Sequence, residues 1–145
     1  MTKLCAECGE RAVERLAVSG RRSPWKQFPS LPIPAELEIP TCAKCGAEWF
    51  DRKTALAVDA ALGREAENLM RRIAREAIDA LSLTINQRDL EAQLGLSAGY
   101  ISKVKHGKET PSAQLVAALS LLASQPSRLE EVERIWETGH FKAIR

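Results

Sequence analysis

The chain has 145 residues, of which 45% are hydrophobic and 28% are charged. This composition is typical of a soluble globular protein with one domain or two small ones, and the length excludes a catalytic barrel or a doubly wound enzyme fold. No stretch approaches the roughly 18 consecutive apolar residues of a membrane span, and the first nine residues lack the features of a secretion signal. We therefore expect a cytoplasmic protein that does not contact a membrane.

The N-terminal segment is rich in turn-forming residues and contains all four cysteines. Ala12 to Ser19 and Ala35 to Thr41 have the pattern of two short strands. Residues 21–34 lie between them and hold four of the seven prolines, which is too many for a regular element. We expect a loop there, ordered or partly ordered, with a hairpin arm as the alternative.

From about Ala47 onward the sequence has helical periodicity. One apolar run precedes Gly63, which weakens the pattern, and a second run from Ala66 to Leu81 keeps the spacing of one helix face. The pattern then predicts helices over 86–94, 97–105, 112–123 and, after Pro126, 127–137. We therefore expect a zinc-binding domain at 1–46, a connecting helix at 47–65 and a helical domain at 66–145.

The cysteines form two copies of the motif C-x2-C-G, at Cys5 and Cys8 and again at Cys42 and Cys45. A two-residue spacer lets both thiolates of one copy face the same ion, and the following glycine relieves the turn. Four thiolates complete a tetrahedral shell, so we expect one structural Zn2+ ion per chain. Two disulfides, unpaired buried cysteines and an iron–sulfur or redox role are the alternatives. A reducing cytosol disfavours the disulfides.

The formal net charge is only +2, so any case for nucleic acid depends on where the charge lies. The window from Gly95 to Lys108 contains no acidic residue, and it contains Lys103, Lys105 and Lys108. His106 adds a further group that can become positive. This window therefore carries a local charge of +3 in a chain whose total is +2.

The segment from Thr84 to Gly107, which contains most of this window, has the spacing of a helix, a tight turn and a second helix. Asn86 and Ser97 are candidate caps, and Gly95 can adopt the left-handed conformation of the turn. A small core is expected from Leu90, Leu94, Leu96, Ile101 and Val104. The second helix leaves Ala98, Gly99, Ser102, Lys103 and His106 facing outward. An all-helical bundle with a solvated lysine face is the alternative.

Residues 83–108 read L-T-x-x-Q-x-x-L-x-x-x-L-G-L-S-x-x-Y-I-S-K-V-x-x-G-K, and Pro111 and Ser112 follow. This segment resembles the Xre/Cro-type helix-turn-helix family over roughly 81–123, although Glu91 replaces a usual alanine and Lys105 a frequent glutamate. The resemblance implies that the helix at 97–105 enters the major groove of double-stranded DNA while flanking residues hold phosphates. The expected DNA-binding residues are Gln87, Ser97, Ala98, Gly99, Tyr100, Ser102, Lys103, His106 and Lys108.

Taken together, the paired C-x-x-C-G motifs, the Ile39-Pro40-Thr41-Cys42 segment, the Glu48-Trp49-Phe50-Asp51 segment and the helix-turn-helix pattern resemble the MqsA-type antitoxins. The resulting fold class is mainly α: a small zinc-ribbon-like β domain followed by a five-helix domain. The resemblance implies that the zinc domain binds a toxin, a small ribonuclease, and that the second domain dimerises and represses its own operon. A stand-alone zinc-ribbon transcriptional regulator is the alternative.

Two further surfaces are expected. Trp25, Phe28, Leu31 and Ile33, held by flanking prolines, are candidates for a partner-binding surface, or for single-stranded RNA binding through Trp25 and Phe28. A homodimer reading an inverted repeat needs an apolar seam, for which the candidates are Leu129, Val132, Ile135 and Trp136. We expect no enzyme activity, because a zinc hydrolase needs an open metal position and the zinc domain contains no histidine.

Overall fold

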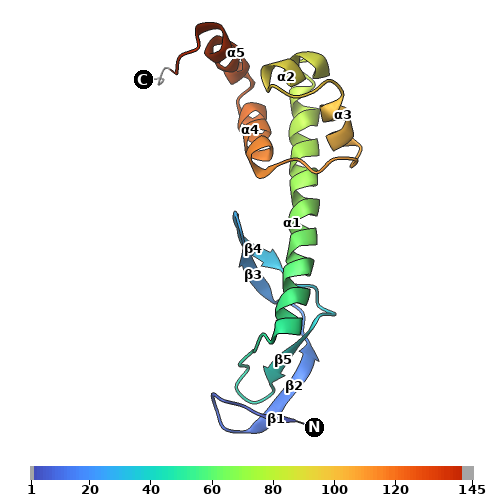
Figure 1. Cartoon of the computed structure of the whole chain (residues 1–145), viewed down its shortest axis with the longest axis vertical. Coiled ribbons are helices and arrows are strands. Elements are labelled where there is room, and N and C mark those ends of the chain that lie inside the picture. Colours follow the sequence, from blue (N-terminus) through green and yellow to red (C-terminus); the bar gives the residue numbers. More distant parts are fainter. Residues whose placement is uncertain (1, 142–145) are drawn as a thin grey trace. The chain divides into compact units, whose positions relative to one another are not determined.

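The structure is a computed structural model, and it describes residues 2–141. The chain forms two compact units, Met1–Ala66 and Glu67–Arg145. Five strands lie in the first unit, while four of the five α-helices in the described residues lie in the second (Figure 1). The expected mainly helical class with a small antiparallel sheet is confirmed. No helix within residues 2–141 is long and apolar enough to cross a membrane.

The first unit is built on a three-stranded antiparallel sheet in the order β1-β2-β5. Its strands are β1 (Lys3–Leu4), β2 (Arg11–Ala17) and β5 (Glu38–Cys42). Both expected strands are present, although β5 begins at Glu38. Val13 pairs with Cys42 and Leu16 with Ile39, and this register places the second cysteine motif directly beside the strand that follows the first motif.

The proline-rich segment is a second sheet, which corrects the expectation of a loop. Strands β3 (Arg22–Trp25) and β4 (Phe28–Pro32) form an antiparallel hairpin with a register irregularity between Ser23 and Trp25. In a two-stranded sheet each strand has one free edge. Proline has no N–H to donate, so it is tolerated on such edges and at irregularities. The hairpin arm that was the alternative is therefore the observed structure.

A buried arginine connects the hairpin to the three-stranded sheet. The Arg21 side chain is only 8% exposed and pairs with Glu48. Its guanidinium also donates to the backbone oxygen of Leu16 at 2.9 Å and to Thr41 Oγ1 at 2.7 Å. Because guanidinium donors have a fixed planar geometry, these contacts determine how the hairpin leaves the sheet.

Helix α1 (Arg52–Leu81) starts at a side-chain cap. The Asp51 carboxylate accepts the backbone N–H of Thr54 at 2.7 Å. This hydrogen bond, helped by the Thr54 side chain and by Arg15, lowers the pKa of Asp51 below its ordinary value of 3.8. Arg15 also donates to Thr54 Oγ1 at 3.3 Å, so strand β2 and the start of α1 are tied together.

Helix α1 continues without interruption through Gly63, which corrects the expectation of two separate helical stretches. A glycine inside a helix costs about 1 kcal/mol relative to alanine. Burial of the neighbouring Leu62 and Ala66 offsets that cost. Gly63 also faces the ring of Trp25, since a Cβ built at this position would lie 3.8 Å from Trp25 Cζ2.

The second unit packs helices around one hydrophobic core. After the end of α1 come α2 (Gln87–Gln93), α3 (Tyr100–Lys105), α4 (Ala113–Ser124), the 3-10 helix η1 (Pro126–Arg128) and α5 (Leu129–Thr138). The buried side chains at its centre are Ala74, Ala77, Ile78, Leu81, Leu90, Ile101, Val104, Val116, Leu119, Leu122 and Leu129. Of the core expected between the second and third helices, Leu90, Ile101 and Val104 are fully buried, and Leu94 and Leu96 pack against them.

One of the two expected helix caps is present and the other is not. The Asp89 N–H donates to Asn86 Oδ1 at 2.9 Å, which confirms Asn86 as the cap of α2. Ser97 does not cap α3, because this helix begins at Tyr100 after Gly99, whose φ is 82° and which supplies no side chain. The Glu91 carboxylate of α2 accepts the N–H of Ile101, in the first turn of α3, in its place.

Candidate functional site

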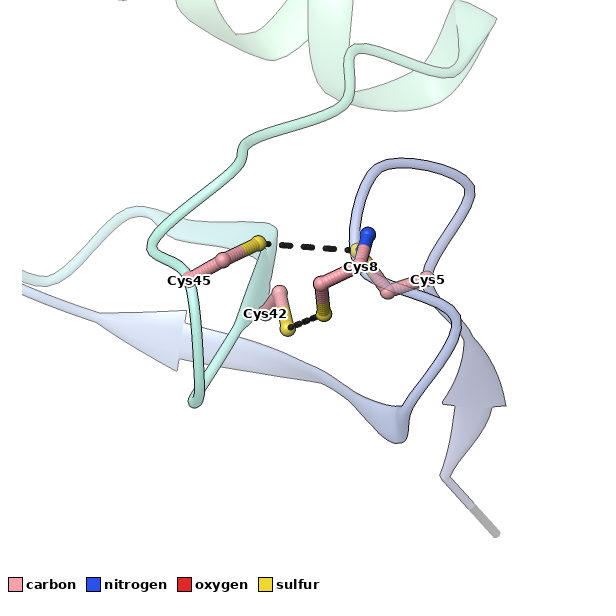
Figure 2. Close-up of side chains that lie close together, drawn as sticks. All are labelled: Cys5, Cys8, Cys42 and Cys45. Atoms are coloured by element: carbon pink, nitrogen blue, oxygen red, sulfur yellow. Dashed lines mark hydrogen bonds between the residues drawn. The ribbon is translucent and has the colours of Figure 1, made fainter.

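The four cysteines come together in the first unit (Figure 2). Cys5 follows β1, Cys42 is the last residue of β5, and Cys8 and Cys45 lie in the turns after them. The glycine after each motif has a left-handed backbone, with φ of 74° at position 9 and 76° at position 46. Cys5 and Cys42 are 1% exposed, whereas Cys8 and Cys45 lie at the surface.

The sulfur atoms have the spacing of a tetrahedral shell. Cys5 Sγ is 3.6 Å from Cys45 Sγ, and Cys8 Sγ is 3.7 Å from Cys42 Sγ. All four sulfurs lie within 4.8 Å of one another. Four thiolates about 2.3 Å from a central ion would lie about 3.8 Å apart. The four cysteines are free, and their sulfurs are too far apart for the disulfide bond length of about 2.05 Å.

Ionisation of these thiols is strongly uneven. Backbone N–H groups of Cys45 and Lys44 lower the pKa of Cys42 from 9.0 to about 7. The backbone N–H of Glu10 favours the Cys8 thiolate, but burial and the other three thiols outweigh it and raise the pKa of Cys8 to about 12. The cluster therefore favours the Cys42 thiolate, and a bound cation would be needed to stabilise the thiolates of Cys8 and Cys45, whose pKa values are raised.

This arrangement can hold a single metal ion, with one sulfur from each cysteine. Because the protein would supply all four ligands, no coordination position would remain for water or substrate. The site is thus suited to stabilising the fold rather than to metal-assisted hydrolysis, in which an open position is required. A two-residue strand such as β1 gains little stability alone, and the metal would cross-link it to β5.

The residues expected to contact DNA surround α3 in the second unit. Gln87 is exposed at the start of α2, and Ser97 and Ala98 are exposed in the turn before α3. Ser102 is half-buried on α3 itself. Lys103 on α3 and His106 and Lys108 after it are also exposed. His106 Nδ1 lies 2.7 Å from the backbone oxygen of Ser102, so the two residues share one face.

Two of the expected DNA-binding residues also shape the turn and the core. Tyr100 packs against the hydrophobic core of the second unit. Gly99 provides the left-handed conformation immediately before α3. Lys105, which was counted in the positive window, forms an ion pair of 3.0 Å with Asp79 of α1. Within residues 2–141, Lys103 and Lys108 form no ion pair, so they carry the remaining positive charge of the window.

The structure corrects the expected partner-binding surface on the hairpin. Leu31 and Ile33 are 1% and 6% exposed, so they belong to the core of the first unit and cannot act as exposed anchors. Strand alternation explains this, because residues two apart point to the same face, and here that face is covered. Trp25 and Phe28 remain half-buried, and the Lys26 ammonium lies 5.7 Å from the Trp25 ring centroid.

The expected dimer seam is also only partly exposed. Leu129 is 6% exposed and Val132 packs against the same core, because α5 folds back onto α2 after the Pro126 turn. Ile135 and Trp136 remain 40% and 66% exposed. The Trp136 indole N–H donates to the backbone oxygen of Gln93 at 2.7 Å, which ties α5 to the end of α2.

Sequence reasoning did not identify the role of Glu91. This residue was noted only because it replaces a smaller one. In the structure its side chain is 4% exposed, and its carboxylate accepts the backbone N–H of Ile101 at 3.0 Å. A residue ten positions away therefore supplies the missing cap of α3, and only the absence of a capping side chain at Gly99 hinted at it.

No family model and no curated protein sequence matches this chain.

Proposed function

We propose that this chain is a sequence-specific, zinc-containing transcriptional repressor, and that it acts as the antitoxin of a toxin–antitoxin module. The observation that carries the DNA-binding part is the α2–turn–α3 arrangement. Two short helices share the buried contacts of Leu90, Ile101 and Val104, and the second helix presents Lys103 to solvent beside further positive groups. These features support the proposal because a helix-turn-helix places its second helix in the major groove.

Within this proposal the side chains around α3 have two kinds of role, base contact and phosphate contact. Ser102 and Lys103 contact base edges, and Lys103 fits the guanine acceptors O6 and N7. Ala98 is available for contact with a thymine methyl group. Gln87, His106 and Lys108 contact phosphates, which position the helix but carry no sequence information.

The metal of the first unit is proposed to be zinc. The sulfur spacings of 3.6 and 3.7 Å agree with the edge of a zinc tetrathiolate, about 3.8 Å. Soft thiolate ligands in tetrahedral geometry favour zinc or iron over magnesium and calcium. The two surface cysteines leave the ion close to solvent, where zinc, unlike iron, is not oxidised. Zinc would thus hold the first unit in shape.

The antitoxin role assigns the first unit to a toxin and the second to DNA. It is supported by the motif order of the chain and by the two separate compact units. In this arrangement a homodimer contacts two half-sites of an inverted repeat, and Ile135 and Trp136 provide exposed apolar surface for the seam. A stand-alone regulator with the same DNA-binding unit is the second candidate, and it is favoured if no toxin gene lies beside this one.

Selection of bound sequences from a random duplex pool tests the DNA-binding function. We expect an inverted repeat to be enriched. Lys103→Ala should relax base preference at one position by about 1 to 3 kcal/mol, whereas Lys108→Ala should weaken binding to all sequences alike. Failure of the zinc-loaded wild type to enrich any sequence, with its fold intact, would refute sequence-specific binding.

Copurification with the product of the adjacent short open reading frame separates the two candidates. Capture of a ribonuclease whose activity is blocked by the complex supports the antitoxin role. The first unit should be sufficient for capture, and Lys103→Ala should leave it unchanged. An enriched operator without any captured neighbour favours the stand-alone regulator.

A further inference from the structure

The second unit carries a row of basic side chains on α1 that the proposed α2–α3 contacts do not include. We propose that Arg75, together with Arg71 and Lys108, binds the phosphate backbone of double-stranded DNA beside the base pairs contacted by α3. This inference rests on the proposed DNA-binding function. It extends the DNA surface from α3 onto the long helix, and we call these three residues the basic ridge.

Contacts on either side of Arg75 place it beside α3. One turn earlier on α1, Arg71 Nη2 donates to Thr110 Oγ1 at 2.6 Å, in the segment that follows α3. One turn later, Asp79 pairs with Lys105 at the end of α3. Residues four apart lie on the same face of a helix. Arg75 therefore lies on the α1 face that is bordered by α3 and the segment after it.

The charges around Arg75 leave it available for a polyanion. Its side chain is exposed, and it makes no ion pair or hydrogen bond within residues 2–141. Asp79, the nearest acidic residue on this face by spacing, is occupied by Lys105 at 3.0 Å. Arg71 is only weakly paired with Glu67, at 3.9 Å, and its buried Nε has no partner within the described residues.

Lys108 continues the ridge from α1 towards α3. It is exposed and lies two residues before Thr110, the residue to which Arg71 donates. Its backbone N–H donates to the Lys103 oxygen at 2.8 Å, so the segment carrying it is folded against the end of α3. Glu109 is the one acidic residue between Gly95 and Thr110. The ridge and the exposed Lys103 thus present positive charge on neighbouring elements, as a duplex backbone requires.

The salt dependence of duplex binding tests the ridge, because each phosphate contact releases counterions. The measurement is fluorescence anisotropy with a labelled 30-base-pair duplex of mixed sequence, about 50 to 300 mM KCl, and zinc-loaded full-length protein. Arg75→Gln should reduce the slope of log K against log salt by about 0.9 for each protomer bound to the duplex, and it should weaken binding about fivefold per protomer at 150 mM salt. The loss should be the same for any duplex sequence.

Arg134→Gln is the matched control. It removes the same single charge from an exposed arginine, and its residue lies on α5, well apart from α3 in the second unit (Figure 1). It should leave the slope and the affinity unchanged. If Arg75→Gln behaves like this control while the wild type binds, the basic ridge is wrong and the α2–α3 function stands. If the wild type binds no duplex at all, both proposals fail.

Discussion

Replacing Glu91 tests how α3 is held in place. Glu91→Ala removes the acceptor for the Ile101 N–H and leaves that buried donor without a partner. A hydrogen bond to a charged group contributes about 1.5 to 3 kcal/mol, and an unsatisfied buried donor costs a similar amount. We therefore expect Glu91→Ala to lower the free energy of unfolding of the second unit by about 2 kcal/mol.

Thermal unfolding followed by circular dichroism measures this loss. For a unit of this size, about 1 kcal/mol corresponds to a shift of about 4 to 8 °C, so the midpoint should fall by roughly 10 °C. Glu91→Gln keeps an oxygen that can accept the same N–H, and it should lose less than half as much. Glu76→Ala removes an exposed glutamate from α1 and serves as the control, with almost no expected change.

Two results would refute the reasoning about Glu91. If Glu91→Ala unfolds at the wild-type temperature, the buried hydrogen bond does not stabilise α3. If Glu91→Gln is as unstable as Glu91→Ala, the accepting oxygen is not the feature that matters. If Glu91 stabilises α3 as predicted, Glu91→Ala should also bind duplex DNA more weakly at temperatures below the unfolding midpoint of the variant. Ser102 and Lys103 lie on α3, the helix that Glu91 caps.

Three further predictions concern the first unit and the seam. Metal analysis of the wild type should give about one zinc per chain, and Cys42→Ser should lose this zinc and unfold the strands of the first unit. Retention of stoichiometric zinc by the variant would contradict the four-ligand site. Asp51→Asn should lower the unfolding midpoint of the first unit at pH 7. The pKa of Asp51 is lowered in the folded state, so the difference in midpoint between wild type and variant should persist above about pH 4. It should shrink as the pH falls further, because the wild-type carboxylate becomes protonated. Equal midpoints at pH 7 would exclude a stabilising cap. Trp136→Ala should convert a dimer to folded monomers in sedimentation analysis, and an unchanged dimer would place the seam elsewhere.

Local sequence patterns were sufficient for the features that depend on short-range spacing. The duplicated C-x2-C-G motif predicted the cysteine cluster, because a two-residue spacer already directs two thiolates to one point. The three-and-four apolar spacing predicted the helices, and Asn86 could be predicted as a cap because the N–H that it accepts, that of Asp89, lies only three residues away. Within each motif, as between Asn86 and Asp89, the residues concerned are close in the sequence, whereas the two motifs meet only because β2 pairs with β5.

The tertiary structure decided the features in which distant residues meet. Proline content argued against strands at 21–34, but the Arg21 contacts with Leu16, Thr41 and Glu48 hold a hairpin there. Burial of Leu31 removed an expected anchor, since exposure depends on what packs against a side chain. The cap that Glu91 provides for α3 and the pairing of Lys105 with Asp79 join residues 10 and 26 positions apart. A local sequence pattern cannot predict such pairs, because the two residues come into contact only when the helices pack against each other.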